Sequence, residues 1–470
     1  MKVKSISRQF VFLSLIFGFI LMVVIPPFQS PDEDSHFKKA YVISRGDFYP
    51  SVNGESTGYY LPDKMINYIN EKLTYIGDLD KKQTYEEVLN QERDTSGFLN
   101  YTFQGFSTDS VIPLGHFIPA VGIFAGKTLG YVFGLEHFST VYMLYFARLG
   151  CLIFYITIVA LAIRLSPAFK KSFMLIGLLP MSMALAATVS YDGLLISLAM
   201  LAVSLTLRLF LKEDEQLNWK YLAVFSIMGV VFLNIKMVYS FVMVPLICLP
   251  LKKSLDMKKS VKFILLMAGI ILAGTFIIKY PVPSVSNIES GPSLTSQQIS
   301  FMLSNPGKML SVLYNEMFVN RFFYLSGMIG IFGLLDTYLP VFAYISILLL
   351  MLLMIFLDAN SFTGKLNIYF KGINIFSLCV GVFGIFIAFY ILWTPMMPGY
   401  GIGAESISGV QGRYFIPLLV LLPVIFQSNR IANNQYIQKY KDVCLNNAYL
   451  LPIIALSVSV ITIFLRFWTI

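Results

Sequence analysis

An acidic cluster follows the first apolar segment of the chain. This segment runs from Phe10 to Pro27, and Ser30-Pro31-Asp32-Glu33-Asp34-Ser35-His36-Phe37 comes directly after it. Three adjacent carboxylates repel one another and are unfavourable in a bilayer, so they are suited to act as a base, to bind a metal or to meet a cationic partner. The alternative is a solvated loop at a helix end, in which Ser30 or Asp32 caps the next helix. The spacing alone does not choose between the two.

The composition indicates a helical membrane protein. Of the 470 residues, 56% are hydrophobic and 13% are charged, and the mean hydropathy is +0.70. Many segments reach the roughly 20 apolar residues that a helix needs to cross the hydrocarbon. The first segment follows basic residues but ends in Ile25-Pro26-Pro27-Phe28 rather than in a small-residue cleavage site. This pattern predicts an uncleaved signal anchor.

About eleven segments are predicted to span the membrane, and residues 1–470 are expected to form one all-α integral membrane domain. The segments are 9–27, 141–163, 172–188, 193–211, 221–235, 238–251, 262–280, 338–357, 372–393, 413–427 and 449–467.

The distribution of basic residues supports this count. With the N-terminus in the cytoplasm, the short outer loops 189–192, 236–237 and 394–412 contain only Lys236. Nineteen basic residues then lie on the inner side: Lys2, Lys4, Arg8, Arg164, Lys170, Lys171, Arg208, Lys212, Lys220, Lys252, Lys253, Lys258, Lys259, Lys262, Lys365, Lys371, Arg430, Lys439 and Lys441. The net charge of +9 is therefore a topology signal and indicates no nucleic-acid partner.

Two further apolar segments are expected to lie along the membrane or to re-enter it. Counting 113–135 as a span would place the lysine-rich loops outside. Segment 317–336 is rich in Phe and Gly but is interrupted by Arg321 and Asp336, and amphipathic segments of this kind commonly lie at the interface. If one or both of these segments crossed the membrane instead, the protein would have twelve or thirteen spans.

Two large segments are then predicted to face outward. The first extracytoplasmic loop, 28–140, has a polar middle from Asn53 to Thr108. The second, 281–337, opens with Pro281-Val282-Pro283-Ser284, which is typical of a loop. Most transporter folds are built from repeated helix bundles, so a large loop between the first two spans disfavours a transporter.

Four motifs resemble those of a known family. The sequence from Pro27 to Phe37 resembles the Pro-Asp-Glu-x-x-His-Phe signature of the bacterial membrane-protein family catalogued as domain of unknown function 2142. Three later segments of the chain resemble further motifs of this family: Ser190-Tyr191-Asp192-Gly193, Lys236-Met237-Val238-Tyr239 and Gly409-Val410-Gln411-Gly412-Arg413-Tyr414-Phe415. The resemblance therefore covers nearly the whole chain. That family is similar to the C-type glycosyltransferase superfamily, polytopic enzymes with an acidic motif in the first outer loop. Asp34 departs from the signature, in which a neutral residue is expected, so that Asp32, Glu33 and Asp34 all stay open as the base.

The resemblance implies a glycosyltransferase in the bacterial plasma membrane. Such an enzyme would transfer a sugar from a polyprenyl-phosphate donor to a cell-envelope glycopolymer, glycolipid or other acceptor on the outer face, with inversion. A carboxylate would take the proton of the acceptor hydroxyl as an oxocarbenium-like transition state forms. We expect Asp32 to be this base and Glu33 to hold the acceptor or a divalent cation such as Mg²⁺ or Mn²⁺. Metal dependence is left open.

The same resemblance assigns residues to the donor phosphate. A leaving phosphate is stabilised by cations or backbone donors. Arg413 is expected to bind it in bidentate fashion, with Lys236 and Tyr239 as further contacts. The alternative for Arg413 is an anchor that snorkels to the interface.

Four other residues are weaker candidates for acceptor or metal binding. Asp192 lies at an outer helix entrance, where it would equally well cap the helix. Asp34, His36 and His116 belong to the first outer loop, in which a histidine is more often structural. Arg148 lies inside a predicted span, so it should face the bundle and pair with an acid.

Two other functions stay open at this stage. A flippase or transporter of lipid-linked glycans would need charged residues deep within several spans, where the sequence offers mainly Arg148. A noncatalytic component of polysaccharide assembly is the other alternative.

Overall fold

The computed structural model describes residues 5–54, 56–90, 100–109, 111–135, 138–252, 254–281, 293–358, 363–428, 439, 441 and 445–469. This part of the chain is mostly helical and contains two small antiparallel sheets. Four basic residues predicted on the inner side (Lys2, Lys4, Lys253 and Arg430) and part of the second outer loop (282–292) lie outside the described residues.

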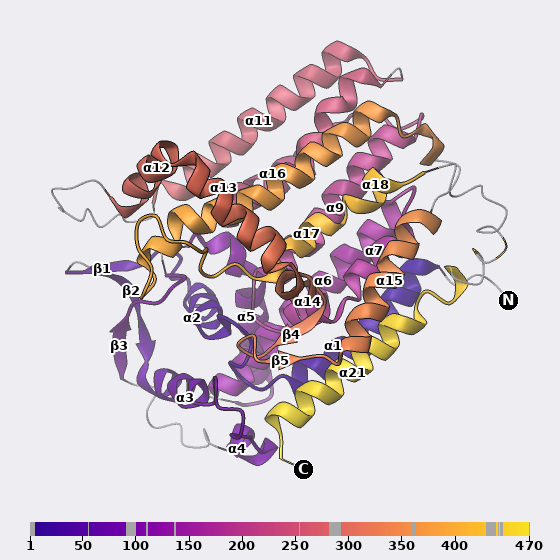
Figure 1. Ribbon diagram of the computed structural model, residues 1–470. Helices are drawn as coiled ribbons and strands as arrows, with labels where there is room; N and C mark the ends of the chain where they lie inside the picture. Colours follow the sequence, from indigo (N-terminus) through magenta and orange to yellow (C-terminus); the bar gives the residue numbers. More distant parts are fainter. Residues whose placement is uncertain are drawn as a thin grey trace.

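Six of the described helices are long and apolar enough to cross a membrane. They are α1 (Ile6–Val24), α6 (Thr140–Leu165), α9 (Asp192–Leu211), α11 (Met257–Lys279), α16 (Ile368–Leu392) and α21 (Leu450–Phe467). Each coincides with a predicted span, and all six are labelled in Figure 1. Of the six, α9 is the most buried within the protein, whereas α11 is the least buried and lies at the edge.

The other five predicted spans are shorter or broken. Three are the apolar helices α10 (Trp219–Ile235), the 3₁₀ helix η2 (Met237–Leu251) and α15 (Val341–Leu357). Segment 172–188 is divided into α7 (Lys170–Gly177) and α8 (Pro180–Ala186). Segment 413–427 is divided into η6 (Gly412–Phe415), α17 (Ile416–Leu419) and α18 (Leu422–Phe426). Pro180, Pro417 and Pro423 explain these interruptions, because proline lacks the N–H that would continue the preceding turn. The count of eleven stays a prediction.

The first predicted outer loop contains a compact lobe. Its elements are α2 (Glu33–Ser44), β1 (Ser51–Asn53), β2 (Ser56–Pro62), α3 (Asp63–Leu73), α4 (Tyr85–Asn90), β3 (Tyr101–Gln104), η1 (Pro113–His116) and α5 (Phe117–Val132). The strands form an antiparallel sheet in the order β1-β2-β3, with Ser51 opposite Gly58 and Tyr59 opposite Gln104. Strands β1–β3 and helices α3 and α4 lie together at the lower left of Figure 1.

Helix α5 packs along α6 through three glycines. Gly122, Gly126 and Gly130 lie one turn apart, and a Cβ atom on any of them would collide with α6 or the loop before it. Small residues at this spacing allow two helices to approach closely. The apolar segment 113–135 is therefore a short helix pressed against a longer one.

The second predicted outer loop is helical where it is described. It contains α12 (Leu294–Ser304), α13 (Pro306–Tyr314), the π-helical turn η3 (Asn315–Val319), α14 (Arg321–Gly330) and a hairpin of β4 (Ile331–Phe332) and β5 (Thr337–Tyr338). Two 3₁₀ turns, η4 (Thr363–Lys365) and η5 (Thr394–Met396), complete the described elements. Segment 317–336 thus forms no continuous helix.

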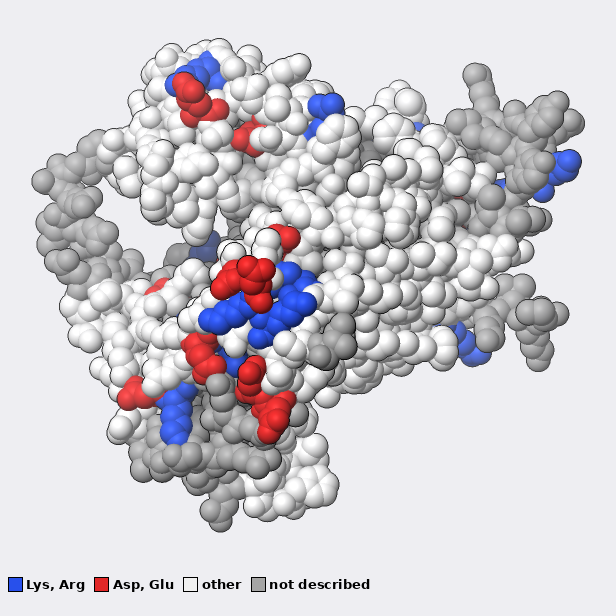
Figure 2. Space-filling model, turned by 60° about the horizontal axis from the view of Figure 1, so that its bottom comes forward, with Lys and Arg blue, Asp and Glu red and all other residues white. Residues whose placement is uncertain are grey.

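Charged side chains are unevenly distributed over the surface. On the face in Figure 2, Asp, Glu, Lys and Arg side chains gather toward the left, and a broad uncharged area separates them from Lys and Arg side chains at the right edge. An uncharged band of this kind is expected where a protein meets lipid.

Candidate functional site

The acidic motif begins in the turn between α1 and α2 and continues into the first residues of α2. Asp32 precedes α2 in the left-handed conformation, with φ of 63°, and its carbonyl accepts a hydrogen bond from the backbone N–H of His36 at 3.0 Å. A residue other than glycine adopts this conformation rarely, and such residues occur frequently at functional sites. The turn leaves 55% of the Asp32 side chain exposed.

Four charged residues from distant parts of the sequence meet at this turn. Arg413 Nη2 lies 2.9 Å from Asp32 Oδ2, and Arg413 Nε lies 3.5 Å from Asp192 Oδ2. Lys236 Nζ lies 2.8 Å from Asp192 Oδ1. We call Asp32, Arg413, Asp192 and Lys236 the charge chain. Three of the predicted site motifs therefore converge on the fourth, the acidic motif.

The charge chain is buried at one end and open at the other. The side chains of Arg413 and Asp192 are only 4% and 7% exposed, and that of Lys236 is 18% exposed. Burial of charges is tolerated when they are paired. Although burial alone would lower the pKa of Lys236, attraction by Asp192 raises it above its ordinary value. Asp32 is the member that solvent reaches most readily.

The cations in the charge chain retain unused donors. Arg413 Nε is buried and makes no hydrogen bond within the described residues, although Asp192 lies within ion-pair distance. Lys236 has three N–H groups, of which one donates to Asp192. A further anion could therefore contact the unused N–H groups of Lys236, which is 18% exposed, without displacing both carboxylates.

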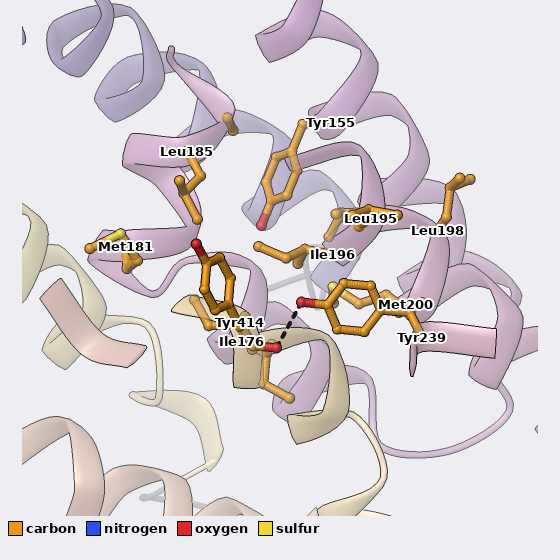
Figure 3. Packing of buried hydrophobic residues seen from close by; sticks show 14 of the residues in the cluster. Tyr155, Ile176, Met181, Leu185, Leu195, Ile196, Leu198, Met200, Tyr239 and Tyr414 are labelled. Carbon is orange, nitrogen blue, oxygen red and sulfur yellow. Dashed lines mark hydrogen bonds between the residues drawn. The ribbon is translucent and has the colours of Figure 1, made fainter. Parts of the chain in front are cut away.

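Aromatic rings surround the two cations. Lys236 Nζ lies 3.9 Å from the centre of the Tyr414 ring and 5.1 Å from that of Tyr191. The Tyr239 hydroxyl donates to the backbone carbonyl of Tyr414 at 2.8 Å, as Figure 3 shows. Tyr239 was expected to contact phosphate, but it is only 1% exposed and its hydroxyl is already bonded. Its place indicates that it positions the segment that carries Arg413.

Gly412 allows this segment to lie against α14. A Cβ atom on Gly412 would come within 2.6 Å of the carbonyl carbon of Gly327 and would also collide with the carbonyl oxygen of Tyr324. Packing against α14 thus explains the glycine before Arg413. The close contact between η6 and α14 also fixes the position of the Arg413 backbone.

Glu33 lies away from the charge chain in a buried ion pair. Its Oε2 and Oε1 accept from Arg148 Nη2 at 2.6 Å and Nε at 2.8 Å, and it also accepts from the backbone N–H groups of Val189 and Phe28. Both side chains are fully buried. The prediction that Arg148 pairs with an acid is confirmed. The expectation that Glu33 holds an acceptor or a metal is not supported by its position, because both carboxylate oxygens are occupied within the protein.

His36 and His116 form a buried pair beside the charge chain. His36 Nδ1 lies 2.8 Å from His116 Nε2, and the edge of the Tyr191 ring packs against His36. Burial lowers the pKa of His36 to about 4, despite the opposing attraction of Asp32. Burial and the neighbouring His36 hold the pKa of His116 well below its ordinary value. Both imidazoles are therefore neutral near pH 7.

Asp34 has a different environment from Asp32. It pairs with Lys38 one turn later in α2, at 3.2 Å, and does not take part in the charge chain. Among the described residues, no group of three His, Cys, Asp or Glu side chains is arranged to hold a metal ion. A metal role for Glu33, Asp34, His36, Asp192 or His116 stays a prediction.

A family model described as "Predicted membrane protein (DUF2142)" matches residues 15–422. The chain belongs to this family. The match covers the acidic motif and the whole charge chain, whereas helix α21 lies beyond it. No curated protein and no solved structure matches the chain. Membership in the DUF2142 family confirms the resemblance seen in the motifs and describes a membrane protein.

Proposed function

We propose that this DUF2142 protein is a bacterial membrane glycosyltransferase that uses a polyprenyl-phosphate sugar as donor. The observation that carries the proposal is the exposed carboxylate of Asp32 next to the buried Arg413 and the partly buried Lys236 of the charge chain. A carboxylate that can take a proton and cations that can hold a phosphate are the two groups that such a transfer needs.

Each residue of the charge chain then has a role. Asp32 accepts the proton of the acceptor hydroxyl while the hydroxyl oxygen attacks the anomeric carbon from the face opposite the phosphate. The bond between the anomeric carbon and the phosphate oxygen breaks, and the electron pair leaves with polyprenyl phosphate. Arg413 and Lys236 stabilise that charge, and Asp192 positions both cations. The sugar is transferred with inversion, and the proton stays on Asp32 until solvent removes it.

The proposal includes the sidedness of the protein. We infer that all eleven predicted segments cross the plasma membrane and that the charge chain faces outward. The nineteen basic residues on the opposite side support this orientation. The acceptor is accordingly a cell-envelope glycan or glycolipid.

The buried Glu33–Arg148 pair favours an enzyme over a transporter. A transported ion or headgroup needs charged side chains that can exchange partners within the membrane. Arg148 instead donates to Glu33 and to the carbonyls of Met22, Ile25 and Pro26, which makes it part of the scaffold.

Substitution of Asp32 tests the proposal. Purified Asp32→Asn protein, given its polyprenyl-phosphate sugar and acceptor, should release free polyprenyl phosphate about 10² to 10⁴ times more slowly than the wild type, because a general base has been lost. Asp34→Asn is the matched control, because it removes a neighbouring carboxylate that pairs with Lys38.

Two results would refute the assignment. One is a wild-type rate for Asp32→Asn. The other is movement of the cognate lipid across sealed vesicles without any bond cleavage, which would instead identify a flippase.

A further inference from the structure

Helices α10 and α11 pack closely and leave an apolar groove between them. A Cβ atom on Gly274 would lie 2.9 Å from Val230, and one on Gly229 would collide with Ile271. The groove has a volume of about 500 Å³. Its walls are a stripe of α10 from Trp219 to Val231, positions Ile270, Gly274 and Ile278 of α11, and Leu114 of η1. Pockets of this size hold small molecules or parts of larger ones.

The groove follows the direction in which a lipid chain lies. The lining stripe of α10 covers twelve residue steps, or about 18 Å at 1.5 Å per residue, which is more than half of a hydrocarbon core about 30 Å thick. The side chains along it are almost all apolar. Ile227 and Ile270 are 63% and 46% exposed, so the groove opens sideways from the protein.

One end of the groove lies near the charge chain, since its lining on α10 ends at Val231, one helical turn before Ile235. Helix α10 ends at Ile235, and the next residue is Lys236. Leu114 lines the groove, while the adjacent Gly115 packs between Ile235 and Tyr191, with contacts at 3.3 and 3.4 Å from an added Cβ atom. The four-residue helix η1 therefore contacts the groove through Leu114. Its last residue, His116, contacts His36, which follows Asp32 in the acidic motif.

We propose that the groove between α10 and α11 binds the hydrocarbon chain of the anionic lipid whose phosphate contacts Lys236 and Arg413. An apolar groove with one end near the cations Lys236 and Arg413 matches a molecule with a long apolar chain and one anionic end. This inference rests on the proposed function, since it uses the same phosphate site. It adds the part of the protein that would distinguish a long-chain lipid from a short one.

Two matched tryptophan substitutions test the groove. Ala223→Trp fills it, whereas Ala273→Trp adds the same side chain to an exposed position of α11 outside it. Binding to purified protein is measured with a long-chain polyprenyl phosphate and with geranyl phosphate, which has the same headgroup and a short chain. Ala223→Trp should weaken binding of the long-chain lipid about tenfold through lost chain contacts. It should leave geranyl phosphate unaffected, and Ala273→Trp should behave as the wild type.

The possible results separate this inference from the proposed function. Long-chain binding by Ala223→Trp at the wild-type level would overturn the groove and leave the phosphate site standing. Equal competition by phosphatidylglycerol would also overturn it, since the groove would then hold any bilayer lipid. A wild-type protein that binds neither phosphate would refute the phosphate site and the groove together. If Ala223→Trp fails to fold, Ile270→Trp fills the groove from the opposite wall and gives the same test.

Discussion

Residues of the charge chain differ most in their access to water. Arg413 and Asp192 are buried, whereas more than half of the Asp32 side chain is exposed. Electrostatic interactions are stronger where water is excluded, so the buried guanidinium of Arg413 is suited to holding a phosphate. The exposed carboxylate is suited to meeting an acceptor that arrives from solution.

Arg413→Lys should weaken lipid-phosphate binding although it keeps the charge. The guanidinium meets Asp32 through Nη2 and Asp192 through Nε, and a single ammonium group cannot reproduce this geometry. Loss of a hydrogen bond between charged groups costs about ten- to a hundredfold in affinity. Equilibrium binding of polyprenyl phosphate would measure it, with the exposed Arg321→Lys as control. Equal affinities of Arg413→Lys and Arg321→Lys for polyprenyl phosphate would contradict a role of the Arg413 guanidinium geometry in phosphate binding.

The histidine pair predicts a pH dependence of stability. His36 has a pKa of about 4 in the folded protein and an ordinary value of 6.5. The unfolded chain therefore binds more protons between these values, so stability should be full above pH 6.5 and should fall as the pH drops toward 4. The thermal midpoint in detergent, recorded across this range, would show the loss. His36→Gln should flatten the profile, and a slope identical to that of the wild type would exclude His36 as the cause.

At the level of elements, two interrupted segments build the site. The segment that contains α7 and α8 leads into the N-terminus of α9, which carries Asp192. The segment from η6 to α18 carries Arg413 as its second residue. Broken helices in a membrane place backbone and polar side chains where a continuous helix would place only apolar ones.

Gly412→Ala should disturb the site from outside the charge chain. The added methyl group would collide with α14, and overpacking of this kind costs about 1–3 kcal/mol. The expected results are a lower thermal midpoint and weaker lipid-phosphate binding, because η6 must shift and carry Arg413 with it. Gly372→Ala on α16 is the control, since nothing lies within 4 Å of its added Cβ atom. If both variants keep the wild-type midpoint and affinity, the close crossing does not set the position of Arg413.

The sequence predicted the parts of the site better than their partners. Asp32, Asp192, Lys236 and Arg413 were recognisable because charged residues stand out at the ends of apolar segments. The partner of Arg148 was not, because Glu33 lies 115 positions away and only the fold brings the two together. Periodicity and length likewise located the apolar segments, but whether each one forms a continuous helix depends on proline positions and on packing.

For the whole molecule, the decisive prediction is its orientation in the membrane. Cysteine at Asn100 should react with an impermeant maleimide in intact cells, and cysteine at Lys258 should react only after the membrane is opened. Both positions are exposed in the structure, so accessibility to the reagent depends on the membrane alone. The background should lack the four native cysteines. Labelling of the Lys258→Cys protein in intact cells would show that the topology is the reverse of the predicted one and that the charge chain faces the cytoplasm.

The ion pair between Asp32 and Arg413 also bears on how the protein is made. Its partners are 381 positions apart, so the first outer turn is synthesised long before the segment that completes it. Until that segment is inserted, Asp192 and Lys236 have only each other among the charge chain, next to an incomplete bundle. A polypeptide that ends before residue 413 therefore contains most of the predicted spans but lacks Arg413, and its charge chain is incomplete. The charge chain is therefore complete only after the segment that contains Arg413 has been synthesised.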